Sequence, residues 1–148
     1  MTSLLHQTHT DFKVYLIGDK YENNGEFESI AKSIPAELIY FENLSNAVER
    51  EKYANNKEAL WCSGGVNATN YGIQKAISEN LQYVCLLDHD DYWAPNHLAI
   101  LNGIIRTNKV DWICTKTSVG NGVFFPKNIN SRDRLINFLP LPCGVIKS

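Results

Sequence analysis

The feature that most constrains this sequence is an apolar run that ends in a cluster of acids. Residues Gln82 to Leu87 are mostly apolar or aromatic, and the three aspartates Asp88, Asp90 and Asp91 follow directly. A short apolar run of this kind predicts a strand buried on both faces, as in a parallel sheet. Open α/β sheets bind their ligands at the carboxyl ends of their strands. We therefore expect these acids to lie at a binding site.

The spacing of two of the acids suggests what they bind. Side chains alternate along a strand, so Asp88 and Asp90 are expected to share one face. Two carboxylates suit a hard divalent cation, and Mg²⁺ usually takes one or two of them and completes its shell with water and phosphate oxygens. We predict a metal or ligand site here. The alternative is that the acids only solvate the exit of the strand and cap the next helix.

Length and charge narrow the class of protein. The 148 residues predict a single domain, residues 1–148. The net charge is −2, with 14 basic and 16 acidic residues scattered along the chain, which gives no support for a nucleic-acid partner. No apolar run approaches the ~20 residues of a membrane span. The four cysteines lack metal-type spacing, so we expect them to be reduced, which favours a cytoplasmic location.

The rest of the chain alternates between β-rich and helical patterns. This alternation predicts an α/β fold, a three-layer sandwich on a mainly parallel central sheet. The expected strands are 12–18, 38–41, 110–115 and 143–148; the expected helices are 26–33, 66–77 and one beginning at Ala94-Pro95, with a helical turn at 134–139.

Two further polar features lie at the ends of these predicted elements. Asp19 follows the first strand, and Gly64 and Gly65 lead into the helix that carries Asn70. Glycine before a helix allows close backbone approach, and the first turn of the helix offers unpaired N–H groups to an anion. The alternative is an ordinary turn with solvated asparagines.

Three segments in this order carry a family resemblance. They are Leu87–Leu98 with its Asp-x-Asp pattern, Asn67–Ala76 before it, and Leu4–Asp19 near the start. Together they resemble the inverting glycosyltransferases of family 2, which have the GT-A (nucleotide-diphospho-sugar transferase) fold. The resemblance covers residues 3 to 118.

The resemblance implies a reaction and a metal. It implies metal-assisted transfer of a sugar from a nucleotide-diphosphate-sugar, with a UDP-sugar as the first expectation, to the hydroxyl of a glycan or lipid-linked acceptor. Asp88 and Asp90 would hold Mn²⁺ or Mg²⁺ at the diphosphate, which stabilises the charge of the leaving group. Such enzymes build cell-surface polysaccharides, so a place at the cytoplasmic face of the membrane is also expected.

The resemblance assigns further residues to the nucleotide-sugar. Asp19 would meet the base, Gly65 and Asn70 would border the donor pocket, and Asp88 and Asp91 would contact the donor beside the metal.

The sequence also departs from the family pattern. The family opens with a strand that is expected to precede this chain, and its general base is expected beyond Ser148. We therefore expect a donor-binding domain truncated at both ends, without its acceptor-side part. Thr69 stands where the family often has arginine. A sheet edge exposed by the missing strand would favour a homodimer.

Two other interpretations remain open. The chain would serve equally as a non-catalytic nucleotide-sugar binding module. A phosphoryl-transfer domain of the receiver type would place its lysine at a later strand end, where Lys116 stands.

Overall fold

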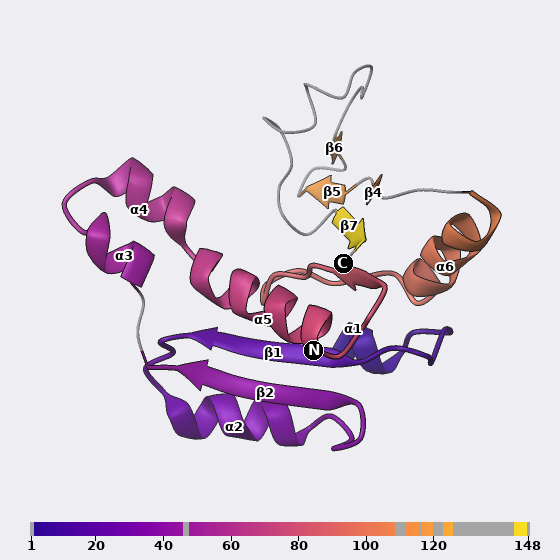
Figure 1. The fold of residues 1–148 in the computed structure, drawn as a ribbon, viewed down its shortest axis with the longest axis horizontal. Coiled ribbons are helices and arrows are strands. Elements are labelled where there is room, and N and C mark those ends of the chain that lie inside the picture. The colour runs from indigo at the N-terminus through magenta and orange to yellow at the C-terminus, as the bar shows by residue number, and fades with distance from the viewer. Residues whose placement is uncertain are drawn as a thin grey trace. The chain divides into compact units, whose positions relative to one another are not determined.

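The structure is a computed structural model, and it describes residues 2–45, 48–108, 112–115, 117–119, 123–125 and 144–147. The chain divides into two compact parts. We call Thr10–Asn80 the central part, and Met1–His9 with Leu81–Ser148 the flanking part. Each part is described by itself (Figure 1).

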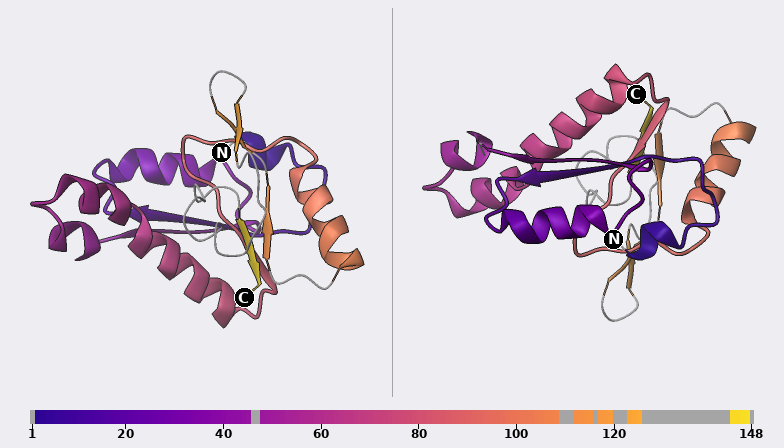
Figure 2. Two further views of the ribbon diagram at one scale, coloured as in Figure 1. Left: turned by 90° about the horizontal axis from the view of Figure 1, so that it is seen from above. Right: turned by 90° about the horizontal axis from the view of Figure 1, so that it is seen from below.

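The central part is built on two parallel strands. Strand β1 (Val14–Asp19) pairs with β2 (Ile39–Leu44) in a register that sets Val14 beside Ile39 and Asp19 beside Leu44. Helix α2 (Asn24–Lys32) connects them and lies on one face, and α5 (Val66–Ser78) lies on the other face (Figure 2). The short helices α3 (Val48–Lys52) and α4 (Lys57–Ser63) lead from β2 to α5.

Packing explains both helix contacts of the central part. On the α2 face, Phe27 is buried and its ring contacts that of Phe41, with centroids 6.4 Å apart. Burying a phenylalanine of this kind contributes about 2–3 kcal/mol. On the α5 face, the small buried residues Ala68 and Ala76 allow the helix to approach the strands closely. Asn23 caps α2, since its side chain accepts a hydrogen bond from the N–H of Glu26 (3.1 Å).

The flanking part contains a three-stranded sheet and two helices. Strand β7 (Gly144–Lys147) pairs antiparallel with both β3 (Tyr83–Cys85) and β4 (Trp112–Cys114), so β3 and β4 run in the same direction. Helix α6 (His97–Thr107) buries Leu98 and Leu101. The remaining elements are helix α1 (Thr2–Leu5) and the hairpin of β5 (Thr117–Val119) and β6 (Val123–Phe125).

The α/β fold with a parallel strand pair agrees with the expectation, and the differences are local. The predicted strand into the acids ends at Cys85, earlier than expected, and its residues are half-buried and not buried on both faces. Strand β2 extends to Leu44, three residues beyond the expected strand at 38–41, and the short helices α3 and α4 are not among the expected helices. The predicted helical turn at 134–139 and Lys116 lie outside the described residues.

Two simpler expectations can be compared with the described part of the chain. Cys62 and Cys85 are free thiols there. Within the described residues, no helix combines the length and apolar character needed to cross a bilayer.

Candidate functional site

The aspartates Asp88, Asp90 and Asp91 lie in a turn, not on a strand. The N–H of Asp91 donates to the carbonyl oxygen of Asp88 (3.1 Å), which closes the turn three residues after β3 ends. The expectation that Asp88 and Asp90 share one face of a strand is therefore wrong, because strand alternation stops before them. The turn still presents its carboxylates to solvent, and the side chain of Asp90 is 76% exposed.

Within this acidic turn (residues 88–91), the surroundings disfavour the charged form of Asp88. Partial burial raises the pKa of the Asp88 carboxyl above its usual value, and the negative charges of Asp91 and Asp90 raise it further, while His89 opposes them. A bound cation would relieve this repulsion. Hard carboxylate oxygens of this kind fit Mg²⁺ or Mn²⁺.

The protein alone does not enclose a cation at this turn. Among the residues that the structure describes, no three His, Cys, Asp or Glu side chains form a group able to hold a metal ion. A cation held by Asp88 and Asp90 would therefore need further oxygen ligands from water or a phosphate. Mg²⁺ sites that work on phosphates usually have this composition.

An aromatic pair follows the acidic turn. The indole of Trp93 stacks on the imidazole of His97, with ring centroids 4.7 Å apart and an interplanar angle of 16°. Trp93 is half-buried, and burial lowers the pKa of His97. Tyr92, between the acids and this pair, is 83% exposed. Trp93 thus stacks on the first residue of α6.

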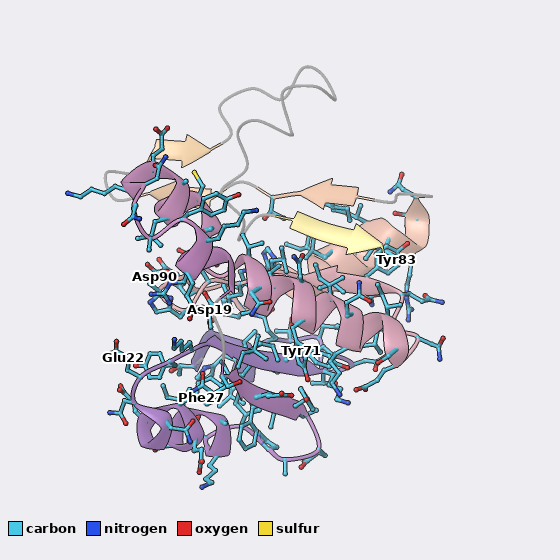
Figure 3. All side chains as sticks on the ribbon, turned by 60° about the vertical axis from the view of Figure 1, so that its left-hand side comes forward. Asp19, Glu22, Phe27, Tyr71, Tyr83 and Asp90 are labelled. Atoms are coloured by element: carbon cyan, nitrogen blue, oxygen red, sulfur yellow. The ribbon has the colours of Figure 1, made fainter. Side chains whose placement is uncertain are left out.

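In the central part, Asp19 ends β1 beside the start of α5 (Figure 3). Its side chain is only 14% exposed, and Oδ2 accepts a hydrogen bond from the backbone N–H of Gly65 (3.2 Å). Its other carboxylate oxygen, Oδ1, is buried and has no hydrogen-bond partner within the described residues. A buried acceptor without a partner is costly, and a ligand donor would satisfy it.

Gly65 begins α5 in a left-handed conformation, with φ +74°. No side-chain hydrogen bond caps this end of the helix. The N–H of Gly65 therefore points toward Asp19, and the N–H groups of the residues that follow belong to the first turn of α5. Asn70, the other residue expected at the donor, is exposed on α5.

Sequence reasoning missed Arg50 on α3. Its Nη1 donates to the carbonyl oxygen of Asp19 (3.2 Å) and lies 3.9 Å from Oδ2 of the same residue. The residues that follow Asp19 and Arg50 in the sequence also form an ion pair, between Lys20 and Glu51 (3.0 Å). No local pattern relates α3 to the end of β1, so the sequence carries no signal of this contact.

A second missed group lies on the α5 face of the strands. Glu42 accepts hydrogen bonds from the hydroxyls of Tyr40 and Tyr71, and the ammonium of Lys75 lies 4.5 Å from the Tyr40 ring centroid. The Glu42 carboxylate raises the pKa of Tyr71 far above its usual value. Tyr40 and Glu42 lie two positions apart on β2 and therefore share a face of the strand. This spacing is the only part of the group that the sequence could have indicated. This group joins α5 to the middle of β2, where Tyr40 lies beside Tyr15 and Glu42 beside Ile17.

Within each part of the chain, the structure brings some of the expected residues together. Asp88, Asp90 and Asp91 share the acidic turn of the flanking part. Asp19 contacts Gly65 in the central part, and Asn70 lies one turn further along α5. The acidic turn follows β3, whereas Asp19 is the last residue of β1 and Gly65 lies between α4 and α5.

Comparison with known proteins gives consistent matches. The family model of glycosyl transferase family 2 matches residues 1–143. An uncharacterized glycosyltransferase of Acanthamoeba polyphaga mimivirus is 39% identical over 98 residues, which cover 66% of this chain and 39% of that protein. Uncharacterized glycosyltransferases of Rickettsia felis and Rickettsia conorii are each 30% identical, over 74% and 75% of this chain but only 14% and 15% of their own lengths. The chain thus spans less than half the length of these relatives. No solved structure matches it.

Proposed function

The chain belongs to glycosyl transferase family 2, as its sequence motifs suggested, and from this we propose that it binds a nucleotide-diphosphate-sugar for sugar transfer with inversion. The observation that carries the proposal is the acidic turn. It holds three carboxylates within four residues. Partial burial raises the pKa of Asp88, and the negative charges of Asp91 and Asp90 raise it further; a cation would relieve this repulsion.

In this proposal the acidic turn binds the metal and the donor. Asp88 and Asp90 would hold Mn²⁺ or Mg²⁺, and Asp88 and Asp91 would contact the donor. When bound, the cation would stabilise negative charge on the leaving diphosphate. The backbone hydrogen bond from Asp91 to Asp88 already orders the turn that carries these carboxylates. This prior ordering lowers the entropic cost of binding.

The central part would recognise the nucleotide. The buried Oδ1 of Asp19 lacks a hydrogen-bond partner within the described residues, and an N–H of the base would supply one. A uracil N–H fits this acceptor, as would an N–H of the other bases, and the UDP-sugar is the donor that we propose. Gly65 and Asn70 would border the same molecule. We assign no general base among the described residues.

The acceptor and the cellular setting are those that the family resemblance implies. We propose a glycan or lipid-linked acceptor and a cytoplasmic location at the membrane face, consistent with the free thiols of Cys62 and Cys85. The pair β1–β2 has two outer edges that bind no further strand within the described residues. Such an edge supports a homodimer formed by strand pairing.

Binding can be tested by thermal unfolding with UDP, Mn²⁺ and a chelator. UDP with Mn²⁺ at tenfold excess over Kd should stabilise the chain by about 1.4 kcal/mol, and the chelator should abolish the effect. Asp90→Ala should abolish the Mn²⁺-dependent part. Glu37→Ala, which removes an exposed carboxylate of the central part, is the control and should respond like the wild type.

Two outcomes would contradict the proposal in different ways. Equal stabilisation by UDP with and without chelator would count against the metal. No stabilisation by any nucleoside diphosphate would count against donor binding. Metal-dependent release of UDP from UDP-sugars then separates an enzyme from a module that only binds the donor.

A further inference from the structure

Gln7 is a buried polar residue that uses both ends of its side-chain amide. It is 6% exposed. Its Nε2 donates to the carbonyl oxygens of Ser3 (3.0 Å) and Ala94 (2.9 Å), and its Oε1 accepts from the backbone N–H of Leu98 (3.0 Å). All these partners are backbone groups of the flanking part. Removing a buried amide of this kind leaves several groups unpaired.

These bonds fix the start of helix α6 from a distant point in the sequence. Asn96 is in the N-cap position, but its side chain makes no capping hydrogen bond. Gln7 instead supplies the acceptor for an N–H of the first turn, across 91 residues. Next to it, the N–H of Thr8 donates to the carbonyl oxygen of Pro95 (2.8 Å), so two neighbouring residues hold the same segment.

The held segment is the exit of the acidic turn. Ala94 follows Asp91 by three positions, with Tyr92 and Trp93 between them. The turn enters from β3 on one side and leaves into the segment held by Gln7 on the other. With both ends of a short loop fixed, the spacing of its carboxylates is restricted, whereas a free exit would let them separate under their mutual repulsion.

We propose that Gln7 is a positioning residue for the acidic turn: by fixing Ala94 and Leu98 it holds Asp88 and Asp90 at the spacing that a divalent cation requires. The cation itself rests on the proposed function. Gln7 touches neither metal nor donor in this proposal and acts through the backbone of the exit segment. The proposal gives the N-terminal segment a role in ligand binding that its distance in sequence conceals.

The test compares Gln7→Met, which keeps the length of the side chain without its hydrogen bonds, with Gln7→Glu, which keeps the acceptor for Leu98. Mn²⁺ affinity is measured by electron paramagnetic resonance on the whole chain. Loss of a supporting hydrogen bond near a metal typically costs ~10-fold or more in affinity. We expect a loss of that size in Gln7→Met and a smaller one in Gln7→Glu.

Two controls separate positioning from general loosening. His6→Ala removes an exposed contact to Thr2 in the same segment and should bind Mn²⁺ like the wild type. Leu101→Val disturbs a buried residue of α6 without touching the turn and should lower stability but not Mn²⁺ affinity. An equal loss of affinity in Leu101→Val would overturn the proposal, as would unchanged affinity in a folded Gln7→Met.

Hydrogen exchange provides a readout that does not depend on metal. The N–H groups of Leu98 and Asp91 are hydrogen-bonded, to Gln7 and to Asp88. Gln7→Met should speed exchange at both. Faster exchange at Leu98 alone would show that Gln7 caps α6 without ordering the turn, and would overturn the proposal. If the wild type binds no Mn²⁺, the proposed function fails, and the exchange rate of Asp91 still decides the role of Gln7.

Discussion

The backbone N–H of Gly65 donates to Oδ2 of Asp19 across 46 residues, at 3.2 Å. This bond joins the end of β1 to the start of α5 and requires Gly65 to turn through φ +74°. One carboxylate oxygen is thereby occupied by the protein, while Oδ1 stays buried without a partner among the described residues. The hydrogen bond to Gly65 therefore fixes the orientation of the Asp19 carboxylate, and Oδ1 is available to accept a hydrogen bond from a ligand.

Gly65→Ala should therefore destabilise the central part. A Cβ at this position would meet no atom within 4 Å, so the cost is conformational and not steric. The left-handed region costs a residue with a Cβ about 1–2 kcal/mol. Gly103→Ala is the matched control, since Gly103 also has open space around it but lies inside α6. It should stabilise by about 0.5–1 kcal/mol in urea unfolding. A loss in both variants would contradict the argument.

Asp88→Asn should abolish Mn²⁺-dependent binding without a loss of stability. The folded pKa of Asp88 is raised, so its contribution to stability is fully present below the unfolded pKa of ~3.9 and is lost as the pH rises through the folded pKa. At pH 7 its charge opposes folding, by at most ~0.5 kcal/mol at an exposed site.

The measurement is the melting temperature from pH 4 to pH 8. The wild type should lose more stability over this rise in pH than Asp88→Asn, which should melt at or slightly above the wild type at pH 7. A clear loss of stability in Asp88→Asn at pH 7 would show that the carboxylate supports the fold through a contact, and not that it is strained by its neighbours.

The two described thiols should differ in reactivity. Burial raises the pKa of Cys85 to about 11, which leaves almost no thiolate at pH 8, whereas Cys62 is exposed on α4. Brief alkylation of the native chain by iodoacetamide should label Cys62 and leave Cys85 unmodified, as read by peptide mass spectrometry. In urea both should react at similar rates. Rapid labelling of Cys85 in the native chain would place β3 in a more open environment.

The sequence predicted helices α2 and α5 and the two parallel strands of the central part because their signals are local, but it did not predict α4. The apolar spacing of 66–77 corresponds to α5 (Val66–Ser78), and 12–18 corresponds to β1 (Val14–Asp19). The acidic turn was placed correctly after a strand but was given strand geometry. Apolar residues alone do not show where a strand stops pairing, and β3 ends at Cys85 although Leu86 and Leu87 continue the pattern.

The contacts that orient the candidate site residues were beyond sequence reasoning. Arg50 reaches Asp19 across 31 residues, and Gln7 reaches Leu98 across 91. Such pairs are joined by the fold and leave no periodic signal in one sequence. Arg50 and Gln7 resemble ordinary surface residues until their partners are known.

The stack of Trp93 on His97 leads to a last prediction, which concerns pH below neutrality. Trp93 is half-buried, so Trp93→Ala should cost about 2 kcal/mol, less than the 3–5 kcal/mol of a fully buried aromatic. Burial lowers the folded pKa of His97, so the unfolded chain binds a proton more readily. The contribution of neutral His97 is fully present above ~6.5 and is lost as the pH falls toward the folded pKa.

His97→Gln should therefore lose less stability than the wild type between pH 7 and pH 5. Asp88 acts in the opposite direction over part of this range, because protonation relieves its charge. In the double variant Asp88→Asn with His97→Gln, the free energy of unfolding should depend least on pH. It is measured by chemical unfolding at fixed ionic strength. If His97→Gln loses as much stability as the wild type between pH 7 and pH 5, protonation of the His97 imidazole is not the cause of that loss. Such a result would contradict the argument from its burial beside Trp93.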